Sequence, residues 1–180
     1  METIKCIKER RSIRKYKDEP VSNEIIGEII SAASFAPSWK NTQTSRYVVI
    51  KDKELKDKIA DECVMGHANN CRIIKEAPVL VVLATRNERS GYERDGSFTT
   101  TKGTHFQSFD AGVAAEAFCL AAYDMGLGTL MMGIYDEGKV KEALEIGPEY
   151  SVSILMALGY TDELPDAPRR KGVEELMILK

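Results

Sequence analysis

Apolar residues in this chain recur with the periods of both regular secondary structures. Between Ser22 and Pro37 the spacing follows one face of a 3.6-residue helix, with Ser22 as its N-cap and Pro37 as its stop. The apolar positions on that face are Ile25, Ile26, Ile29, Ile30 and Ala33. Similar spacing predicts helices over residues 1–10, 54–63, 107–125 and 136–144, and a less regular helical segment between 64 and 76.

Short apolar runs between these helices predict strands. The run over residues 78–84 (PVLVVLA) is continuous and rich in β-branched residues, which is typical of a central strand buried on both faces. Runs over 46–50, 130–134 and 151–158 predict further strands, and residues 173–179 predict a last β-like piece. No repeat or linker divides the chain, so we expect one domain over residues 1–180, α+β or α/β, with four or five strands in one sheet.

Two segments carry no such periodicity. Residues 86–104 (RNERSGYERDGSFTTTKGT) predict a long polar loop, and loops of this length in compact domains are usually active-site lids or disordered. Residues 162–180 begin with a stretch rich in proline and charge and end with the β-like piece. Such an extended C-terminal arm could reach another subunit.

Composition and charge narrow the classes of function. Hydrophobic residues make up 43% of the 180 residues, so the chain can bury a core without a disulfide or a metal. The 25 Lys and Arg residues against 28 Asp and Glu residues give a net charge of −3, which argues against a nucleic-acid-coating protein but permits a local basic pocket. With neither a signal-peptide pattern nor a membrane-spanning apolar run, we expect a cytoplasmic protein with four reduced cysteines.

A basic cluster lies near the N-terminus. Five positive charges fall within eight residues, at Arg10, Arg11, Arg14, Lys15 and Lys17. Guanidinium groups match phosphate oxygens, and the Ser12 hydroxyl could add a hydrogen bond. The cluster predicts an anion site or, as the alternative, a solvated basic face.

A polar loop connects the second predicted helix to the first predicted strand. Its residues 36–43 (APSWKNTQ) carry many side chains that both donate and accept hydrogen bonds. Such a loop could bind a planar heterocycle through the amide groups at the edge of its ring. The alternative is a plain helix-to-strand connector.

Glycines recur over residues 126–133 (GLGTLMMG) and would allow the backbone to approach a ligand closely. The segment follows a helix and enters a strand, whereas a dinucleotide-binding fingerprint follows a strand and enters a helix, so that fingerprint is rejected. A helix stop followed by a buried strand explains the same residues.

Cys63, His67 and Cys71 are spaced by four residues, which on one continuous helix would put three zinc ligands on one face. Gly66 and the asparagine pair after His67 weaken a helix there, and a structural zinc site requires four ligands. Zinc is therefore an alternative only, and no metal is expected. His105 is the only other histidine, which leaves little basis for a His-dependent catalytic site.

Four segments together, in this order, resemble the nitroreductase family of FMN-dependent oxidoreductases. They are RRSIRKY near the N-terminus, APSWKNTQTSRYVVI, GLGTLMMGIYD, and LGYTDELPDAPRRKGVEEL near the C-terminus. The resemblance spans essentially the whole chain. It implies an α+β fold with a central, mixed but mostly antiparallel sheet flanked by helices, in an intertwined homodimer with an exchanged C-terminal arm and two FMN sites at the interface.

The resemblance also implies roles for the matched residues. One subunit would supply Arg10, Arg11, Ser12 and Arg14, with Arg10 and Ser12 at the phosphate and ribityl end of FMN and Arg14 nearer the flavin pyrimidine. The partner subunit would supply Pro37, Ser38, Trp39, Asn41 and Gln43.

Further matched positions complete the implied site. Asn70 falls at the flavin pyrimidine edge, and Met132 and Gly133 would lie against the flavin centre with a backbone N–H near N5. Arg169 and Arg170 would return to the phosphate from the C-terminal arm.

The chain departs from the family pattern at several positions. Thr44–Ser45 stands where Pro-Trp is common, Ile73 where some members have a second cation, and Met132 where many longer members have Glu. Arg14 is thereby left as the main candidate to stabilise the negatively charged reduced flavin.

The resemblance implies an enzyme that passes hydride from NADH or NADPH through flavin N5 to small electron-poor acceptors, such as nitroaromatics or quinones, by ping-pong turnover. No catalytic side chain is required; Arg14 and the Gly133 backbone would tune the flavin. The alternatives are another flavin reaction on the same scaffold (reductive dehalogenation or flavin breakdown) and a non-catalytic protein that stores or senses FMN.

Overall fold

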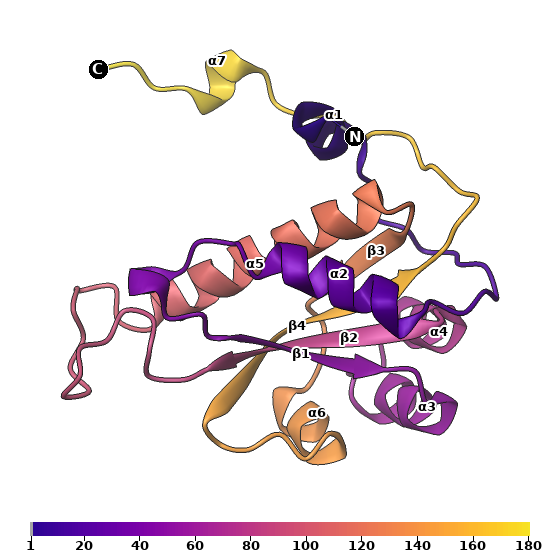
Figure 1. Cartoon of the computed structure of the whole chain (residues 1–180), viewed down its shortest axis with the longest axis horizontal. Helices are drawn as coiled ribbons and strands as arrows, with labels where there is room; N and C mark the ends of the chain where they lie inside the picture. The colour runs from indigo at the N-terminus through magenta and orange to yellow at the C-terminus, as the bar shows by residue number, and fades with distance from the viewer. Residues whose placement is uncertain (1) are drawn as a thin grey trace.

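A computed structural model describes residues 2–180 of the chain (Figure 1). Its helices are α1 (Thr3–Glu9), α2 (Asn23–Ala33), α3 (Lys53–Glu62), α4 (Ala68–Glu76), α5 (His105–Asp124), α6 (Glu137–Ala143) and α7 (Val173–Leu176), with a 3₁₀ turn η1 at Trp39–Asn41. Its strands are β1 (Ser45–Ile50), β2 (Val79–Arg86), β3 (Gly128–Met132) and β4 (Tyr150–Gly159). Residue 1, which the first predicted helix includes, lies outside the described residues.

The strands form one sheet in the order β1-β2-β4-β3, and every neighbouring pair is antiparallel. Helices α2 and α5 cover one face, and α3, α4 and α6 cover the other (Figure 1). The expected α+β class is confirmed, and the expected sheet of four or five strands has four. All of its pairs are antiparallel, whereas a mixed, mostly antiparallel sheet was expected.

The central strand β2 is buried on both faces, as its continuous apolar run predicts. Val79, Val81 and Leu83 belong to the core beneath α2 and α5, whereas Leu80 and Val82 belong to the core beneath α3, α4 and α6. The two sets alternate because successive strand side chains point to opposite faces. The sheet therefore separates two apolar cores.

Side-chain caps fix where several helices begin. The predicted cap Ser22 accepts a hydrogen bond from Ile25 N at 3.2 Å, and Asp52 and Asp136 cap α3 and α6 in the same way. His67 caps α4, its Nδ1 accepting from Asn70 N at 3.2 Å. The less regular predicted helix between residues 64 and 76 thus exists, but it begins only after His67.

Two predicted strands differ in the structure. Strand β3 starts at Gly128, two residues before the predicted start, and ends at Met132, so that Gly133 and Ile134 follow it. The predicted β-like piece over residues 173–179 is wrong, because α7 occupies Val173–Leu176 and residues 177–180 belong to no strand. Gly172 N donates to Glu175 Oε1 at 3.2 Å, which favours a helical turn, and the arm leaves the body with none of the four strands beside it (Figure 1).

None of the helices described for residues 2–180 combines the length and the apolar character that crossing a bilayer would require.

Candidate functional site

The basic segment near the N-terminus lies along the free edge of β3. Ile13 N donates to Thr129 O at 2.9 Å, and Ser12 forms a parallel bridge with Thr129. The approach depends on Gly128, since a Cβ there would lie 2.5 Å from Ile13 Cγ1. Residues 12 and 13 are therefore held by backbone contacts with the sheet.

The arginines of this segment have three different environments. Arg10 Nε lies 3.4 Å from Glu116 Oε1 of α5. Arg11 turns back on α1, its Nη1 donating to Lys8 O at 2.8 Å and Arg10 O at 2.9 Å. Arg14 is exposed, and its Nη1 donates to Ser12 O at 3.1 Å. Arg11 thus stabilises the end of α1, while Arg14 keeps most of its donors free for a ligand.

The beginning of α4 adjoins the same segment and the residues after β3. The buried Asn70 donates through Nδ2 to Ile134 O at 3.5 Å, and Arg72 Nη1 reaches Arg14 O at 3.5 Å. These contacts bring together Arg14, Asn70 and the chain immediately after Gly133. The Met132 side chain is buried in the core beneath α3, α4 and α6, which leaves only its backbone for the predicted contact with a ligand.

The polar loop 36–43 lies at the opposite end of α5. Trp39 N donates to Asp110 Oδ2 at 2.9 Å, and the Trp39 and Phe106 rings lie 4.4 Å apart. The loop contacts α5 around residues 106–110, whereas α1 and Arg10 contact it around residues 116–123. At 1.5 Å per residue the two regions are about 15–20 Å apart along the helix. Within one chain, the polar loop and the basic segment therefore lie apart.

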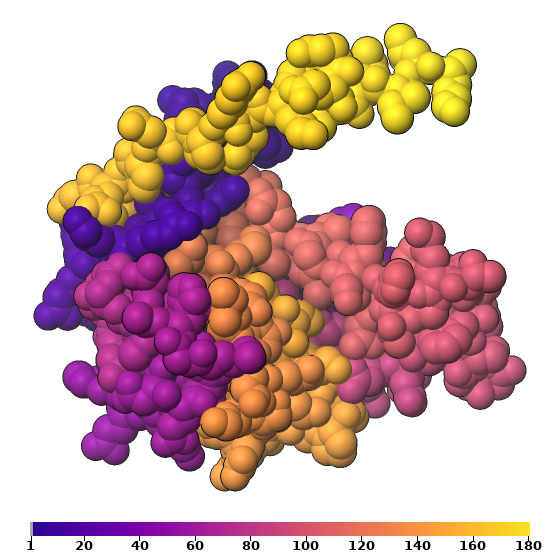
Figure 2. All heavy atoms as spheres, turned by 180° about the vertical axis from the view of Figure 1, so that it is seen from behind, coloured from indigo at the N-terminus to yellow at the C-terminus, as the bar shows by residue number. Residues whose placement is uncertain are grey.

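Arg169 and Arg170 lie in the exposed C-terminal arm. The start of the arm is tied to the basic segment, since Thr161 Oγ1 donates to Lys15 O at 2.9 Å and Lys17 pairs with Asp162 at 2.6 Å. Beyond these contacts the arm passes α1 and projects from the body (Figure 2).

Several buried polar atoms have no hydrogen-bond partner among the described residues. Three of them are donors on residues predicted to bind the ligand, namely Arg10 Nε, Arg11 Nε and Trp39 Nε1. The 3.4 Å ion pair of Arg10 Nε with Glu116 does not have the geometry of a hydrogen bond. Buried donors are normally satisfied. Both the basic segment and the polar loop therefore contain a donor without a hydrogen bond. This is expected where a ligand or a second subunit supplies the missing acceptor.

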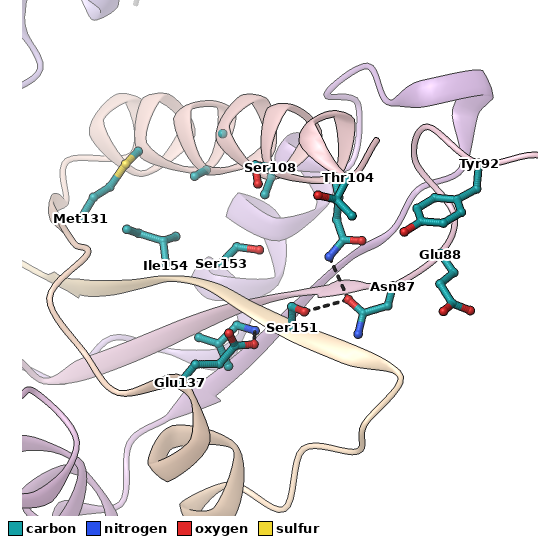
Figure 3. A pocket seen from close by; sticks show the side chains of 15 residues that line it. Asn87, Glu88, Tyr92, Thr104, Ser108, Met131, Glu137, Ser151, Ser153 and Ile154 are labelled. Atoms are coloured by element: carbon teal, nitrogen blue, oxygen red, sulfur yellow. Dashed lines mark hydrogen bonds between the residues drawn. The ribbon is translucent and has the colours of Figure 1, made fainter. Parts of the chain in front are cut away.

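A cleft of about 630 Å³ opens between the first half of α5 and the start of β4 (Figure 3). Met131 and Ile154 line one end of it. At the other end Asn87 Oδ1 accepts hydrogen bonds from Gln107 Nε2 and Ser151 Oγ, both at 2.8 Å. None of the site residues predicted from the sequence lines this cleft. One signal in the sequence could have identified Met131 as a lining residue. Successive strand side chains point to opposite faces, so Met131 lies on the face opposite to that of the buried Met132.

Neither thiol chemistry nor zinc is supported at these sites. Burial raises the pKa of all four cysteines, that of Cys119 to about 11, so the thiols stay protonated at neutral pH. Cys63 lies beyond the end of α3, and His67 uses Nδ1 as a helix cap. Among residues 2–180 no three His, Cys, Asp or Glu side chains are arranged to hold a metal ion, so the zinc alternative finds no support.

The fold and the site together define the class: a three-layer α+β protein with candidate binding residues divided between the two ends of one long helix. The nitroreductase family model matches residues 7–70 and 64–160, and the chain belongs to this family.

Individual relatives span much of the chain. An FMN reductase [NAD(P)H] from Bacillus subtilis is 33% identical over 81% of this chain and 59% of its own length. The solved structure of an FMN-dependent nitroreductase from Clostridium difficile is 30% identical with a TM-score of 0.75, covering 92% of this chain and 91% of its own. A BluB-like flavoprotein from the same species is 28% identical with a TM-score of 0.82, covering 100% and 99%. An iodotyrosine deiodinase from Hydra vulgaris is 28% identical over 94% of this chain and 69% of its own length.

Proposed function

We propose that this chain is an FMN-dependent NAD(P)H oxidoreductase that works as a homodimer, with each FMN bound between the basic segment of one subunit and the polar loop of the other. The observation that carries the proposal is the pair of incomplete donor groups at opposite ends of α5. Membership of the nitroreductase family and the FMN-named relatives support the cofactor.

The residues present fit FMN. Its phosphate and the oxygens of its pyrimidine ring are acceptors, and in the basic segment the Nε atoms of Arg10 and Arg11 make no hydrogen bond, although Arg10 is ion-paired with Glu116. Arg14 adds an exposed guanidinium, and its backbone oxygen contacts Arg72 on the helix that carries Asn70. Arg10 and Ser12 would hold the phosphate end and Arg14 and Asn70 the pyrimidine edge, with the Gly133 backbone beside the ring.

A twofold dimer explains the separation of the two groups. Helix α5 carries a largely apolar stripe on its outer side, with Phe109 64% exposed, Gly112 exposed, and Val113 and Leu120 half-buried. Glu116, which pairs with Arg10, interrupts this stripe. Packing this stripe against an antiparallel copy would bring residues 106–110 of one subunit to residues 116–123 of the other. The polar loop of one subunit would then lie beside the basic segment of its partner. The exposed apolar residues of the arm, such as Leu176 and Ile178, would be covered by the same exchange.

The protein's own contribution to the reaction is binding and electrostatics. FMN, when bound, supplies the hydride-accepting and hydride-donating chemistry between NAD(P)H and a small electron-poor acceptor such as a nitroaromatic or a quinone. Arg14 and the backbone N–H near Gly133 would stabilise negative charge on the pyrimidine. The loop 86–104 supplies Glu88 and Tyr92 to the rim of the cleft, which suits a lid over the acceptor in ping-pong turnover.

Anaerobic titration of the FMN-loaded protein with NADH and NADPH tests the function. We expect rapid bleaching of the flavin absorbance, followed by recovery on addition of a nitroaromatic or quinone. A flavin that NAD(P)H never bleaches would contradict the reductase and leave a protein that stores FMN.

Reductive dehalogenation is the second candidate, favoured by the similarity to an iodotyrosine deiodinase over 94% of the chain. The same titration separates the two reactions. Halide release from a halogenated phenol by the reduced protein, without turnover of nitroaromatics, would favour the dehalogenase.

A further inference from the structure

The polar loop that we assign to the partner's FMN site has an unusual backbone. Lys40, Asn41 and Gln43 have φ values of 45°, 55° and 48°, in the left-handed region that residues other than glycine rarely occupy. Such a conformation persists only where surrounding contacts enforce it. The contacts that hold this loop therefore determine where its donors and acceptors point.

The central contact is a buried carboxylate on α5. Asp110 is 4% exposed, and its Oδ2 accepts two hydrogen bonds, from Trp39 N at 2.9 Å and from Ser90 Oγ at 2.5 Å. Ser90 is fully buried, and its Oγ also lies 3.2 Å from Thr42 Oγ1. One carboxylate thus connects three segments: the loop at residues 39–42, the start of the 86–104 loop, and α5.

Two further contacts of the loop, beyond the bond of Thr42 with Ser90 and the packing of the Trp39 ring on Phe106, are local or exposed. Gln43 N donates to Ser38 Oγ at 3.0 Å within the loop itself, and Lys40 pairs with Glu93 at 3.0 Å at the surface. Charge-assisted hydrogen bonds to a buried carboxylate are stronger than exposed ion pairs, which salt and water weaken. Asp110 is therefore the main polar contact between the strained loop and α5, beside the apolar packing of Trp39 on Phe106.

We propose that Asp110 is a positioning residue, which holds residues 38–43 in the conformation that the FMN site of the partner subunit requires. This inference rests on the proposed function. Asp110 would act through the Trp39 backbone and through Ser90 and would not itself touch the cofactor.

The first experiment measures the loop directly. Trp39 is the only tryptophan of the chain, so tryptophan fluorescence of the FMN-free protein reports on this loop alone. Asp110→Asn keeps the size of the side chain but removes its charge, and we expect a red-shifted emission as Trp39 becomes more solvated. Glu62→Gln, an exposed acidic position at the end of α3, is the matched control and should leave the spectrum unchanged.

The second experiment measures FMN binding well below the melting temperature. Asp110→Asn should weaken FMN binding on the order of tenfold, because the charge-assisted bonds to Trp39 N and Ser90 become ordinary ones. Ser90→Ala should shift Trp39 emission and FMN affinity in the same direction, and it serves as the test if Asp110→Asn does not fold. A purely structural Asp110 would lower Tm but leave the FMN Kd of the folded protein unchanged, which would overturn the proposal.

Mixed dimers identify the subunit on which Asp110 acts. An equal mixture of Asp110→Asn and Arg10→Ala chains, after subunit exchange, contains dimers in which both changes fall in one site and the other site is intact. About one quarter of all sites should then bind FMN with the wild-type affinity. Recovery of no such sites would overturn the action across the interface. A wild-type protein that binds no FMN would refute the proposed function and this inference with it, an outcome distinct from unchanged binding by Asp110→Asn.

Discussion

The two halves of the proposed site are held in place by different means. The basic segment is attached to the sheet through the backbone hydrogen bond from Ile13 N to Thr129 O and the bridge of Ser12 with Thr129, and Asn70 is fixed at the first turn of α4. The polar loop 38–43 belongs to no long element and depends on side chains, above all on Asp110.

This difference has a consequence for mutation. Changes beneath the basic segment alter the fold and the site together, because the same backbone contacts serve both. Changes beneath the polar loop can alter the site while the fold survives. The two halves should therefore respond differently to substitutions of similar size.

The largest effect should follow from separating the halves altogether. Gly112→Arg places a long charged side chain on the exposed stripe of α5, where a new Cβ meets no atom within 4 Å in a single chain. The subunit fold should survive, since glycine is itself unfavourable inside a helix. We expect a monomer with FMN affinity lowered on the order of 100-fold or more, since the substitution disrupts the centre of the proposed interface.

Gly27→Arg on α2 is the matched control, because this helical glycine is also exposed and has open space around it. Analytical ultracentrifugation and FMN titration should show a wild-type dimer for Gly27→Arg. A Gly112→Arg monomer that retains full FMN affinity would show that one chain forms the site alone.

The next largest effect should be a loss of FMN affinity that distinguishes Arg10 from its neighbour Arg11. Arg10→Ala should lower FMN affinity by about 10- to 100-fold, since it removes a charge-assisted phosphate contact on the order of 1.5–3 kcal/mol. Arg11→Ala should mainly loosen α1, because its guanidinium donates to the carbonyls of Lys8 and Arg10. FMN fluorescence titration and thermal unfolding distinguish the two, and a larger loss of FMN affinity in Arg11→Ala would reverse the assignment.

A third pair of variants, Gly128→Ala and Gly133→Ala, tests whether stability and FMN binding change together near the basic segment. Gly128→Ala should destabilise the fold by about 1–3 kcal/mol, because the new Cβ would overlap Ile13. It should also weaken FMN binding by displacing the segment. At Gly133 a Cβ would lie 3.8 Å from Ile154 Cδ1, an ordinary contact, so Gly133→Ala should leave the urea midpoint unchanged and weaken FMN binding only. Equal loss of stability in both variants would contradict this distinction.

The parts of the fold that the sequence predicts well are those that local patterns specify. The apolar run over 78–84 identifies the central strand, and Ser22 marks the start of α2, because burial and capping depend on neighbouring residues. The piece over 173–179 is apolar enough for a strand, but a strand requires a neighbour to pair with, and this chain offers none there. Its local capping contact then forms a helical turn instead.

The candidate site is predictable only in part for the same reason. Motif order indicates which residues belong together, but contacts such as Asp110 with Trp39 join residues 71 positions apart, and no periodicity connects them. The cleft around Asn87, Gln107 and Ser151 also combines three separate segments. Such positions become visible only once the sheet and α5 are placed.

The smallest effect should come from the exposed ion pair between Lys40 of the polar loop and Glu93. Glu93 accepts hydrogen bonds from Thr99 Oγ1 at 2.7 Å and from Lys40 Nζ at 3.0 Å, and these two contacts hold its pKa below the ordinary value of 4.5. Because the pKa is lower in the folded protein, the stabilisation is complete above pH 4.5 and disappears as the pH falls through the lowered pKa.

Glu93→Gln should therefore change Tm and FMN affinity only slightly at pH 7, and the variant and the wild type should converge as the pH falls, since the protonated carboxyl no longer pairs with Lys40. Thermal unfolding and FMN titration at pH 7 and at a series of values below pH 4.5 measure both quantities. If Glu93→Gln weakens FMN binding as much as Asp110→Asn, the polar loop is held from the surface as firmly as from the interior, and the distinction between its buried and exposed contacts fails.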